Sequence, residues 1–264
     1  MTPSTARVAR TIGLEIWLPI VLVVVWWFAS ANSTSVYFPP LSSILGSFAH
    51  DWLDPAALPK NLVPSLQLLA LGYLLAVVTG IVLGLVLGLV APLERATRPL
   101  LEVLRAIPGV ALLPIFIVLF GIDLQMKVLL IAFGAFWPVL LNTIDGVRGI
   151  EPVLLDVSRV FRVGRMRRLV SIVLPGASPQ IFAGARTALA IALIIMVVSE
   201  TIGGNGGVGY FLLNAQRNFA ISSMWGAILA LGILGYLLNI VLRIIERSVL
   251  RWHRLQQARL ESQP

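Results

Sequence analysis

The sequence predicts an all-α, polytopic membrane protein with about six transmembrane helices. Of its 264 residues, 58% are hydrophobic and only 12% are charged, whereas an average soluble domain carries about 25% charged residues. The apolar residues form runs long enough to cross a bilayer as helices, each of which needs about 20 residues. The basic residues gather in alternate loops, as the enrichment of lysine and arginine in cytoplasmic loops predicts.

The first apolar run, about 16–31, follows a short basic tail at 1–15. We interpret this run as an uncleaved span, because no small-residue cleavage site follows it and several further apolar runs do. An interfacial helix here, with five spans in all, is the main alternative topology. Residues 32–60 are polar and contain four prolines, which predicts an external segment with one short amphipathic helix at about 41–52.

The second span, about 62–90, carries Gly80, Gly84 and Gly88 at four-residue spacing. This spacing places the glycines on one side of the helix, where a second helix can approach closely. The charged residues 91–105 are expected to form an internal loop and the start of the next helix.

The third span, about 101–120, is interrupted by Pro108, Gly109 and Pro114. Proline in a membrane helix frees backbone carbonyls, which must face protein or water rather than lipid. We therefore expect this helix to line an aqueous path or a dimer interface.

The remaining segments follow in order: spans at about 127–144, 181–202 and 225–245, a polar loop at 149–179 and a basic tail at 247–264. The transmembrane domain therefore covers 16–246. Of the 20 lysines and arginines, all but Lys60, Lys127 and Arg217 fall on the side of the polar loop. This asymmetry predicts that the loop and both ends of the chain are cytoplasmic.

The polar loop at 149–179 predicts a helix with two faces. Its apolar residues follow one helical stripe, formed by Val153, Leu154, Val157, Val160 and Phe161. The polar residues of the helix are Asp156, Ser158, Arg159 and Arg162.

The ends of this helix can also be read from the sequence. Gly164 is the expected left-handed residue that closes it, and Pro175 is the expected end of a second, short basic helix. Such an element could lie in the interface with its arginines on lipid phosphates. We favour docking of the apolar stripe into a groove of a soluble partner.

Catalysis and metal binding find no support in the sequence. It contains no cysteine, no nucleotide-binding glycine-lysine loop and no H-E-x-x-H motif, and His50 and His253 lie in no ligand pattern. We therefore expect a protein that is not an enzyme and holds no metal or cofactor of its own. The net charge of +8 is explained by loops that face anionic lipid, so nucleic acid is not an expected partner.

Glu200 is the acidic residue that stands out within the apolar segments. A charge costs about 2.5–3.5 kcal/mol at mid-bilayer, so such residues often mark a transport path. We assign Glu200 to gating or helix positioning; the alternative is an interfacial carboxylate that caps the glycine-rich loop after it. The residues expected at the path or gate are Arg105, Pro108, Asn142, Met196, Ser199, Glu200 and Asn205, with Arg186 as a weaker candidate.

The polar loop resembles the cytoplasmic EAA loop of binding-protein-dependent ABC transporter permeases. The residues Asp-Val-Ser at 156–158 stand where that loop has its E-A-A triplet, and Ile-Val-Leu-Pro at 172–175 matches its Ile-x-Leu-Pro end. The glycine of the family pattern falls on Arg162, and a glycine follows two residues later, at Gly164.

Three further stretches resemble the nitrate, sulfonate and bicarbonate branch of this family, which includes taurine permeases. They are Pro-Pro-Leu-Ser at 39–42, Arg-Ala-Ile-Pro-Gly at 105–109 and the glycine-rich stretch at 200–210. The resemblance implies the type I ABC importer fold and a homodimer in the bacterial inner membrane.

The resemblance also implies the partners and the solute. Two cytoplasmic ABC ATPase subunits would bind ATP and Mg²⁺, and an extracytoplasmic solute-binding protein would deliver the solute. A sulfonate or taurine-like anion is the favoured solute, with nitrate, bicarbonate, pyrimidines and aromatic acids open. A secondary transporter or channel and a membrane-bound enzyme are the rival classes. The residues expected to couple to the ATPase are Val153, Asp156, Val157, Ser158, Arg159, Val160, Phe161, Arg162, Gly164 and Pro175.

Overall fold

The computed structural model describes residues 5–250, with side chains from residue 17 onward. The ends of the two expected tails, 1–4 and 251–264, lie outside the described residues. The α-helices are α1 Thr5–Ser30, α2 Leu41–Phe48, α3 Leu58–Asn61, α4 Val63–Leu89, α5 Ala91–Ala106, α6 Leu113–Phe120, α7 Leu124–Arg148, α8 Pro152–Val160, α9 Arg165–Arg168, α10 Leu174–Glu200, α11 Val208–Arg217 and α12 Ile221–Val249. Two π-helical turns, Ala49–Leu53 and Leu169–Val173, and one 3-10 turn, Gly109–Leu112, complete the set for the described chain.

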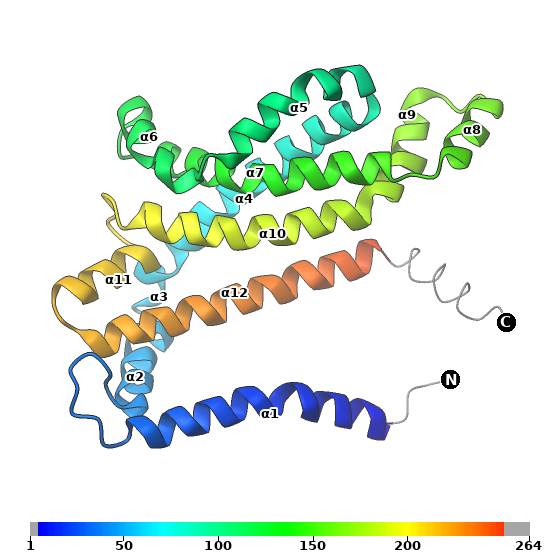
Figure 1. The fold of residues 1–264 in the computed structure, drawn as a ribbon. Coiled ribbons are helices and arrows are strands. Elements are labelled where there is room, and N and C mark those ends of the chain that lie inside the picture. Colours follow the sequence, from blue (N-terminus) through cyan, green and yellow to red (C-terminus); the bar gives the residue numbers. More distant parts are fainter. Residues whose placement is uncertain (1–4, 251–264) are drawn as a thin grey trace.

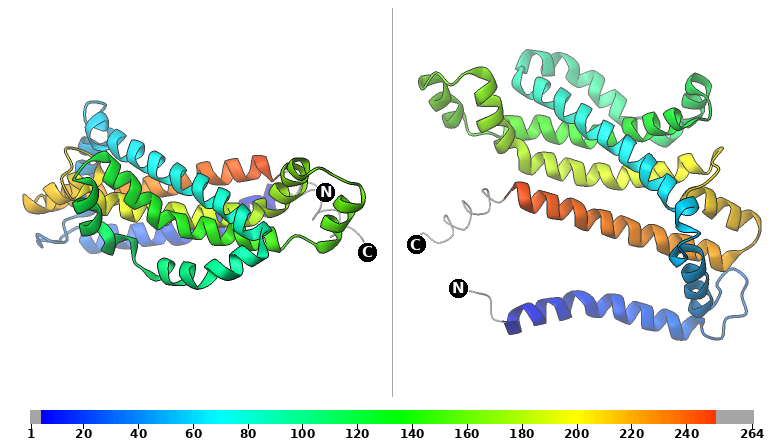
Figure 2. Two further views of the ribbon diagram at one scale, coloured as in Figure 1. Left: turned by 90° about the horizontal axis from the view of Figure 1, so that it is seen from above. Right: turned by 180° about the vertical axis from the view of Figure 1, so that it is seen from behind.

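Helices α4, α7 and α10 form the packed centre of the molecule. Figure 1 shows α7, α10, α12 and α1 as successive rods, with α4 crossing behind. The main apolar core joins α4, α7 and α10, and includes Leu68, Leu130, Ile131, Ala188 and Met196. Helix α1 stands apart and packs mainly against α2 at its C-terminal end, as the view from behind also shows (Figure 2).

The three spaced glycines of α4 form a close contact with α7. A Cβ atom on Gly80, Gly84 or Gly88 would lie 2.8, 2.5 or 2.7 Å from the Cβ atom of the facing residue of α7. The facing residues are Val139, Thr143 and Val147. Gly72, which the sequence reading did not single out, meets Ile131 in the same way. The offset is 59 residues at every contact, so the two helices run parallel and in register.

Among residues 17–250, four or five helices are long and apolar enough to cross a membrane, and the sequence predicted six spans for the whole chain. Four helices qualify directly: Leu58–Leu89, Leu124–Arg148, Arg165–Glu200 and Ile221–Val249. The pair α5 and α6 qualifies as a fifth if it is counted as one broken span, and its two parts meet at 81°. The first expected span corresponds to α1, whose described apolar part is the shorter helix Trp17–Ser30.

The structure differs from the sequence prediction at three places. Residues 91–105 were expected to form an internal loop and the start of the next helix, but all of them lie in helix α5, because Pro92 lies in the first turn, where a helix needs no N–H donor. Helix α1 begins at Thr5, so most of the predicted tail 1–15 is helical. The sequence reading also missed α11, which begins at Val208 directly after the last glycines of the glycine-rich stretch.

Charged and polar elements divide between the two ends of the bundle. The start of α1, the end of α12 and the α8–α9 segment lie at one end (Figure 1). The glycine-rich turn, α2, α3 and α11 lie at the other end. Because the start of α1 and the end of α12 lie at the same end, the chain runs the length of the bundle an even number of times. This count takes the bent pair α5 and α6 as one span.

Candidate functional site

Helix α8 carries the apolar stripe that the sequence predicted, and the rest of the described chain leaves this stripe uncovered. The side chains of Val160 and Phe161 are 79% and 76% exposed, and Val153, Leu154 and Val157 are exposed as well. Only three residues separate α8 from the end of α7. A partner that binds the stripe would therefore act almost directly on a central helix.

The opposite side of α8 faces the bundle. Leu155 packs against the apolar cluster that contains Val147 and Val173. Ser158 is buried, its hydroxyl donates to the carbonyl of Leu155 at 2.6 Å, and its own carbonyl accepts the N–H of Val163 at 2.9 Å. Ser158, expected among the residues that couple to a partner, thus supports the loop from within and does not belong to its free surface.

The turn after α8 differs from the prediction. Arg162 holds the left-handed conformation, with φ of 51°, whereas Gly164 has φ of −57°. A residue other than glycine in this conformation costs roughly 1–2 kcal/mol. The prediction that Gly164 closes the helix is therefore wrong, and the left-handed position lies where the family pattern has its glycine.

Pro175 does not end a helix either. The helical path continues from Arg165 to Glu200, through the π-helical turn Leu169–Val173. The N–H of Leu174 bonds to the carbonyl of Leu169, five residues back. Such a turn is wider than an α-turn, and it leaves room for the ring of Pro175 in the first turn of α10.

A cleft of about 390 Å³ opens where α5 breaks before α6. It brings together two of the predicted path residues, Arg105 and Pro108, with Trp137 and Ile194 from α7 and α10. Arg105 is the only charged residue among those that line the cleft. Sequence reasoning missed Ile194, because nothing in a uniformly apolar span distinguishes the residue that faces a cleft.

Asn142, another predicted path residue, does not line this cleft. Its side-chain amide donates to the carbonyl of Pro138 at 2.8 Å, and Gly184 of α10 packs directly against its Cβ atom. Asn142 therefore belongs to the contact between α7 and α10. Arg186, the weaker candidate, pairs with Glu246 and connects α10 with α12.

Glu200 is the centre of a buried polar network at the other end of the bundle, and its side chain is only 2% exposed. One carboxylate oxygen accepts the hydroxyl of Ser65 at 2.6 Å, and the other accepts the N–H of Gly209 at 2.8 Å. The Ser65 hydroxyl in turn accepts the N–H of Val208 at 2.8 Å. The network satisfies the first free N–H groups of α11, which supports helix positioning over a place on an open path.

The other residues expected beside Glu200 do not form a polar constriction with it. Met196 and Ser199 are completely buried within the chain, and the Ser199 hydroxyl donates to the carbonyl of Met196. Asn205 is exposed in the glycine-rich turn. Two glycines pack directly against Glu200. A Cβ atom added to Gly207 would lie 2.6 Å from the carboxyl carbon of Glu200, and one added to Gly209 would lie 2.9 Å from its Cβ atom.

Comparison with known proteins agrees with this architecture. The model of the family "Binding-protein-dependent transport system inner membrane component" matches residues 76–252. The "Putative aliphatic sulfonates transport permease protein" of Bacillus subtilis is 34% identical over 238 residues, covering 89% of this chain and 86% of that protein. The taurine transport system permease protein of Escherichia coli is 28% identical, covering 93% and 91% of the two chains.

A solved structure shows the same fold. It is described as inward-facing conformations of the MetNI methionine ABC transporter, and the aligned chains share a TM-score of 0.62 at 22% identity. The alignment covers 70% of this chain and 92% of that chain. The fold is therefore that of a type I ABC importer permease, and the chain belongs to the binding-protein-dependent inner membrane components of ABC transporters, in the branch of the sulfonate, taurine, nitrate and bicarbonate permeases.

Proposed function

We propose that two copies of this chain form the path of an ATP-driven importer for a small organic anion, most simply a sulfonate. Separate ATPase subunits bind to the exposed stripe of α8 and move the helices when they bind ATP and Mg²⁺. A solute-binding protein delivers the solute to the opposite end of the bundle. The α8 end is then cytoplasmic, in agreement with the sequence prediction that 17 of the 20 basic residues fall on the side of the polar loop.

The observation that carries this proposal is the uncovered stripe of α8. Its five apolar side chains form one continuous surface on a short helix beyond the ends of the spans. A short amphipathic helix with such a face is suited to a groove in a partner. The exposed charge of Arg162 beside the stripe would orient docking through an acidic rim rather than supply most of the affinity.

The cleft at the break between α5 and α6 supports the choice of solute. One guanidinium group, from Arg105, lies among apolar side chains that include Trp137, Ile194 and Ile195. This combination suits a solute that has an anionic head and a small apolar body, because the guanidinium pairs with oxyanions and the walls exclude water. Nitrate and bicarbonate lack the apolar body, so the cleft suits them less well than it suits a sulfonate. An aromatic acid has both an anionic head and an apolar body, and is therefore the stronger alternative.

Replacing Phe161 with aspartate tests the docking surface. We expect Phe161→Asp to weaken association with the ATPase subunits about thirtyfold, because loss of a central interface anchor costs about 2 kcal/mol or more. The measurement is co-purification of the ATPase with the tagged permease, followed by ATPase activity stimulated by binding protein loaded with an alkyl sulfonate, nitrate or bicarbonate. Tyr37→Asp, at an aromatic residue that is 66% exposed at the other end of the bundle, is the control for co-purification.

Normal association of Phe161→Asp would refute docking on α8. Stimulation by nitrate or bicarbonate but not by a sulfonate would change the solute and leave the docking surface in place. Uptake by the purified chain alone, without ATP, would identify a secondary transporter instead.

A further inference from the structure

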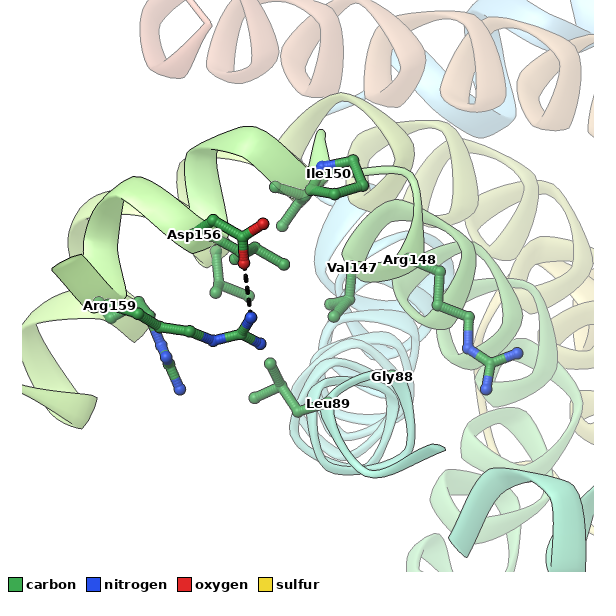
Figure 3. A pocket seen from close by; sticks show the side chains of 11 residues that line it. Gly88, Leu89, Val147, Arg148, Ile150, Asp156 and Arg159 are labelled. Carbon is green, nitrogen blue, oxygen red and sulfur yellow. Dashed lines mark hydrogen bonds and ion pairs between the residues drawn. The ribbon is translucent and has the colours of Figure 1, made fainter. Parts of the chain in front are cut away.

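We propose that the pocket beneath α8 binds the headgroup phosphate of an anionic phospholipid. The pocket has a volume of about 310 Å³ and lies between the ends of α4 and α7, helix α8 and the π-helical turn before α10 (Figure 3). Both α4 and α7 end here as candidate membrane spans. The pocket is thus at the level where the hydrocarbon of a bilayer gives way to headgroups.

The pocket and the exposed apolar stripe lie on different faces of helix α8. Its residues at the pocket are Pro152, Leu155, Asp156 and Arg159, whose spacing of three, one and three residues defines a single helix face. The residues of the stripe lie on another face of the helix. Asp156 and Arg159, predicted to contact the ATPase, therefore lie on the pocket side, and a ligand there does not compete with a protein on the stripe.

Two arginines can offer donors to an anion in the pocket. Arg159 reaches across it toward Leu89 (Figure 3) and gives one hydrogen bond, of 2.6 Å, to Asp156. Its guanidinium carries five N–H groups. Arg168 also lines the pocket and forms no ion pair with any residue from 17 to 250. Arg148 also lines the pocket, but its guanidinium pairs with Glu94 at 2.7 Å and turns away from Arg159 (Figure 3).

The apolar part of the pocket favours a lipid over a free anion. Leu89, Val147, Ile150, Leu155 and Val173 form its wall. Inorganic phosphate gains nothing from such a wall, whereas the glycerol and upper acyl region of a phospholipid buries apolar surface against it.

An apolar track leads from this wall into the membrane. On α4, Val78, Val82, Val86 and Leu89 are exposed along one side of the helix, at spacings of four, four and three residues. The eleven residue-to-residue steps from Val78 to Leu89 rise about 16 Å, roughly half of the ~30 Å hydrocarbon core. One acyl chain of a lipid in the pocket could therefore lie along α4 through a single leaflet.

Lipid retention by the purified full-length chain tests this site. The chain is equilibrated in detergent with phosphatidylglycerol and phosphatidylcholine of the same acyl chains, and native mass spectrometry measures the bound lipid. We expect a preference for phosphatidylglycerol, which Arg159→Gln and Arg168→Gln each reduce about fivefold, the effect of one basic residue near an anionic lipid surface. Arg165→Gln is the matched control, because Arg165 is exposed on the same loop but does not line the pocket.

Four results would overturn the proposal: no preference for the anionic lipid, an equal loss in Arg165→Gln, displacement of the lipid by excess inorganic phosphate, or its displacement by the ATPase subunits. The third would identify a site for soluble anions, and the fourth would assign the pocket to the protein partner. Because lipid retention by the chain alone is measured without ATP or an ATPase, the lipid preference can fail while the proposed transport function stands, and the converse also holds.

Discussion

At the scale of single residues, Glu200 shows how a costly buried acid can serve the fold. Its carboxylate, the Ser65 hydroxyl and the backbone N–H groups of Val208 and Gly209 form one closed network between α10, α4 and α11. Each hydrogen bond contributes about 0.5–1.5 kcal/mol, so the network as a whole fixes α11 to the central helices.

Glu200→Ala should loosen α11 while leaving the remaining helices folded. The variant leaves the Ser65 hydroxyl and the Gly209 N–H without their acceptor, which costs about 1–3 kcal/mol for each unsatisfied buried group. Hydrogen exchange at the start of α11 and the thermal unfolding midpoint measure the effect. Glu102→Ala, which removes an exposed glutamate paired with Arg98, should change neither; equal effects of the two variants would disprove the capping role.

Sequence reasoning located these residues better than it described their contacts. Glu200 is conspicuous because charges are rare in apolar segments, but its partners come from positions 65 and 209, far apart in the chain. The left-handed residue was assigned to Gly164 because glycine adopts that conformation without strain. In the structure Arg162 has the left-handed conformation. Its position depends on how the loop packs against the bundle rather than on the local preference of glycine.

At the scale of helices, the contact between α4 and α7 is the main rigid unit. Four glycines of α4, from Gly72 to Gly88, let the two backbones approach closely along most of their length. In membranes such small residues replace the hydrophobic effect as the basis of helix association, because close packing gains van der Waals contact. The unit continues through three residues into α8, so motion of α8 reaches both helices.

Gly84→Ala should weaken this unit. The added methyl group would lie 2.5 Å from the Cβ atom of Thr143, and overpacking of this kind typically costs about 1–3 kcal/mol. Thermal unfolding of the purified chain should show a lowered midpoint. Gly232→Ala is the control, because a Cβ atom there meets no neighbour within 4 Å although the residue lies in a span; a similar loss in both variants would contradict the close contact.

Helix existence was predictable from hydropathy, whereas some helix ends were not. The long apolar runs identified α4, α7, α10 and α12, since each is both apolar and long enough to span. Pro175 was expected to stop a helix, but a π-helical turn accommodates it. Helix α11 was not predicted, because the glycines before it indicate only a turn. The sequence does not show that the buried Glu200 carboxylate accepts an N–H group from the first turn of this helix.

At the scale of the whole molecule, the two ends of the bundle differ in charge and in structure. The α8–α9 segment with its five arginines lies at one end, and the segment 32–60 with α2 and α3 lies at the other (Figure 1). The positive-inside rule predicts that the α8 end faces the cytoplasm. This orientation is open to direct measurement.

Single cysteines at the two ends should respond to a membrane-impermeant maleimide from opposite sides. The chain contains no cysteine, so the unmodified protein serves as a blank. In cells with a permeabilised outer layer but an intact inner membrane, Tyr37→Cys should be labelled and Val160→Cys should not. Lysis should make Val160→Cys reactive; labelling in the reverse order would invert the topology.

The parallel register of α4 and α7 also has a consequence for biosynthesis. Each contact joins residues 59 positions apart, with the whole α5–α6 excursion translated in between. At about 5–20 residues per second, translation of these residues takes roughly 3–12 s, and during this time the glycine face of α4 lacks its partner α7. Assembly of this centre therefore completes only after α7 leaves the ribosome, and until then the nascent chain depends on lipid or on an insertase to cover this face.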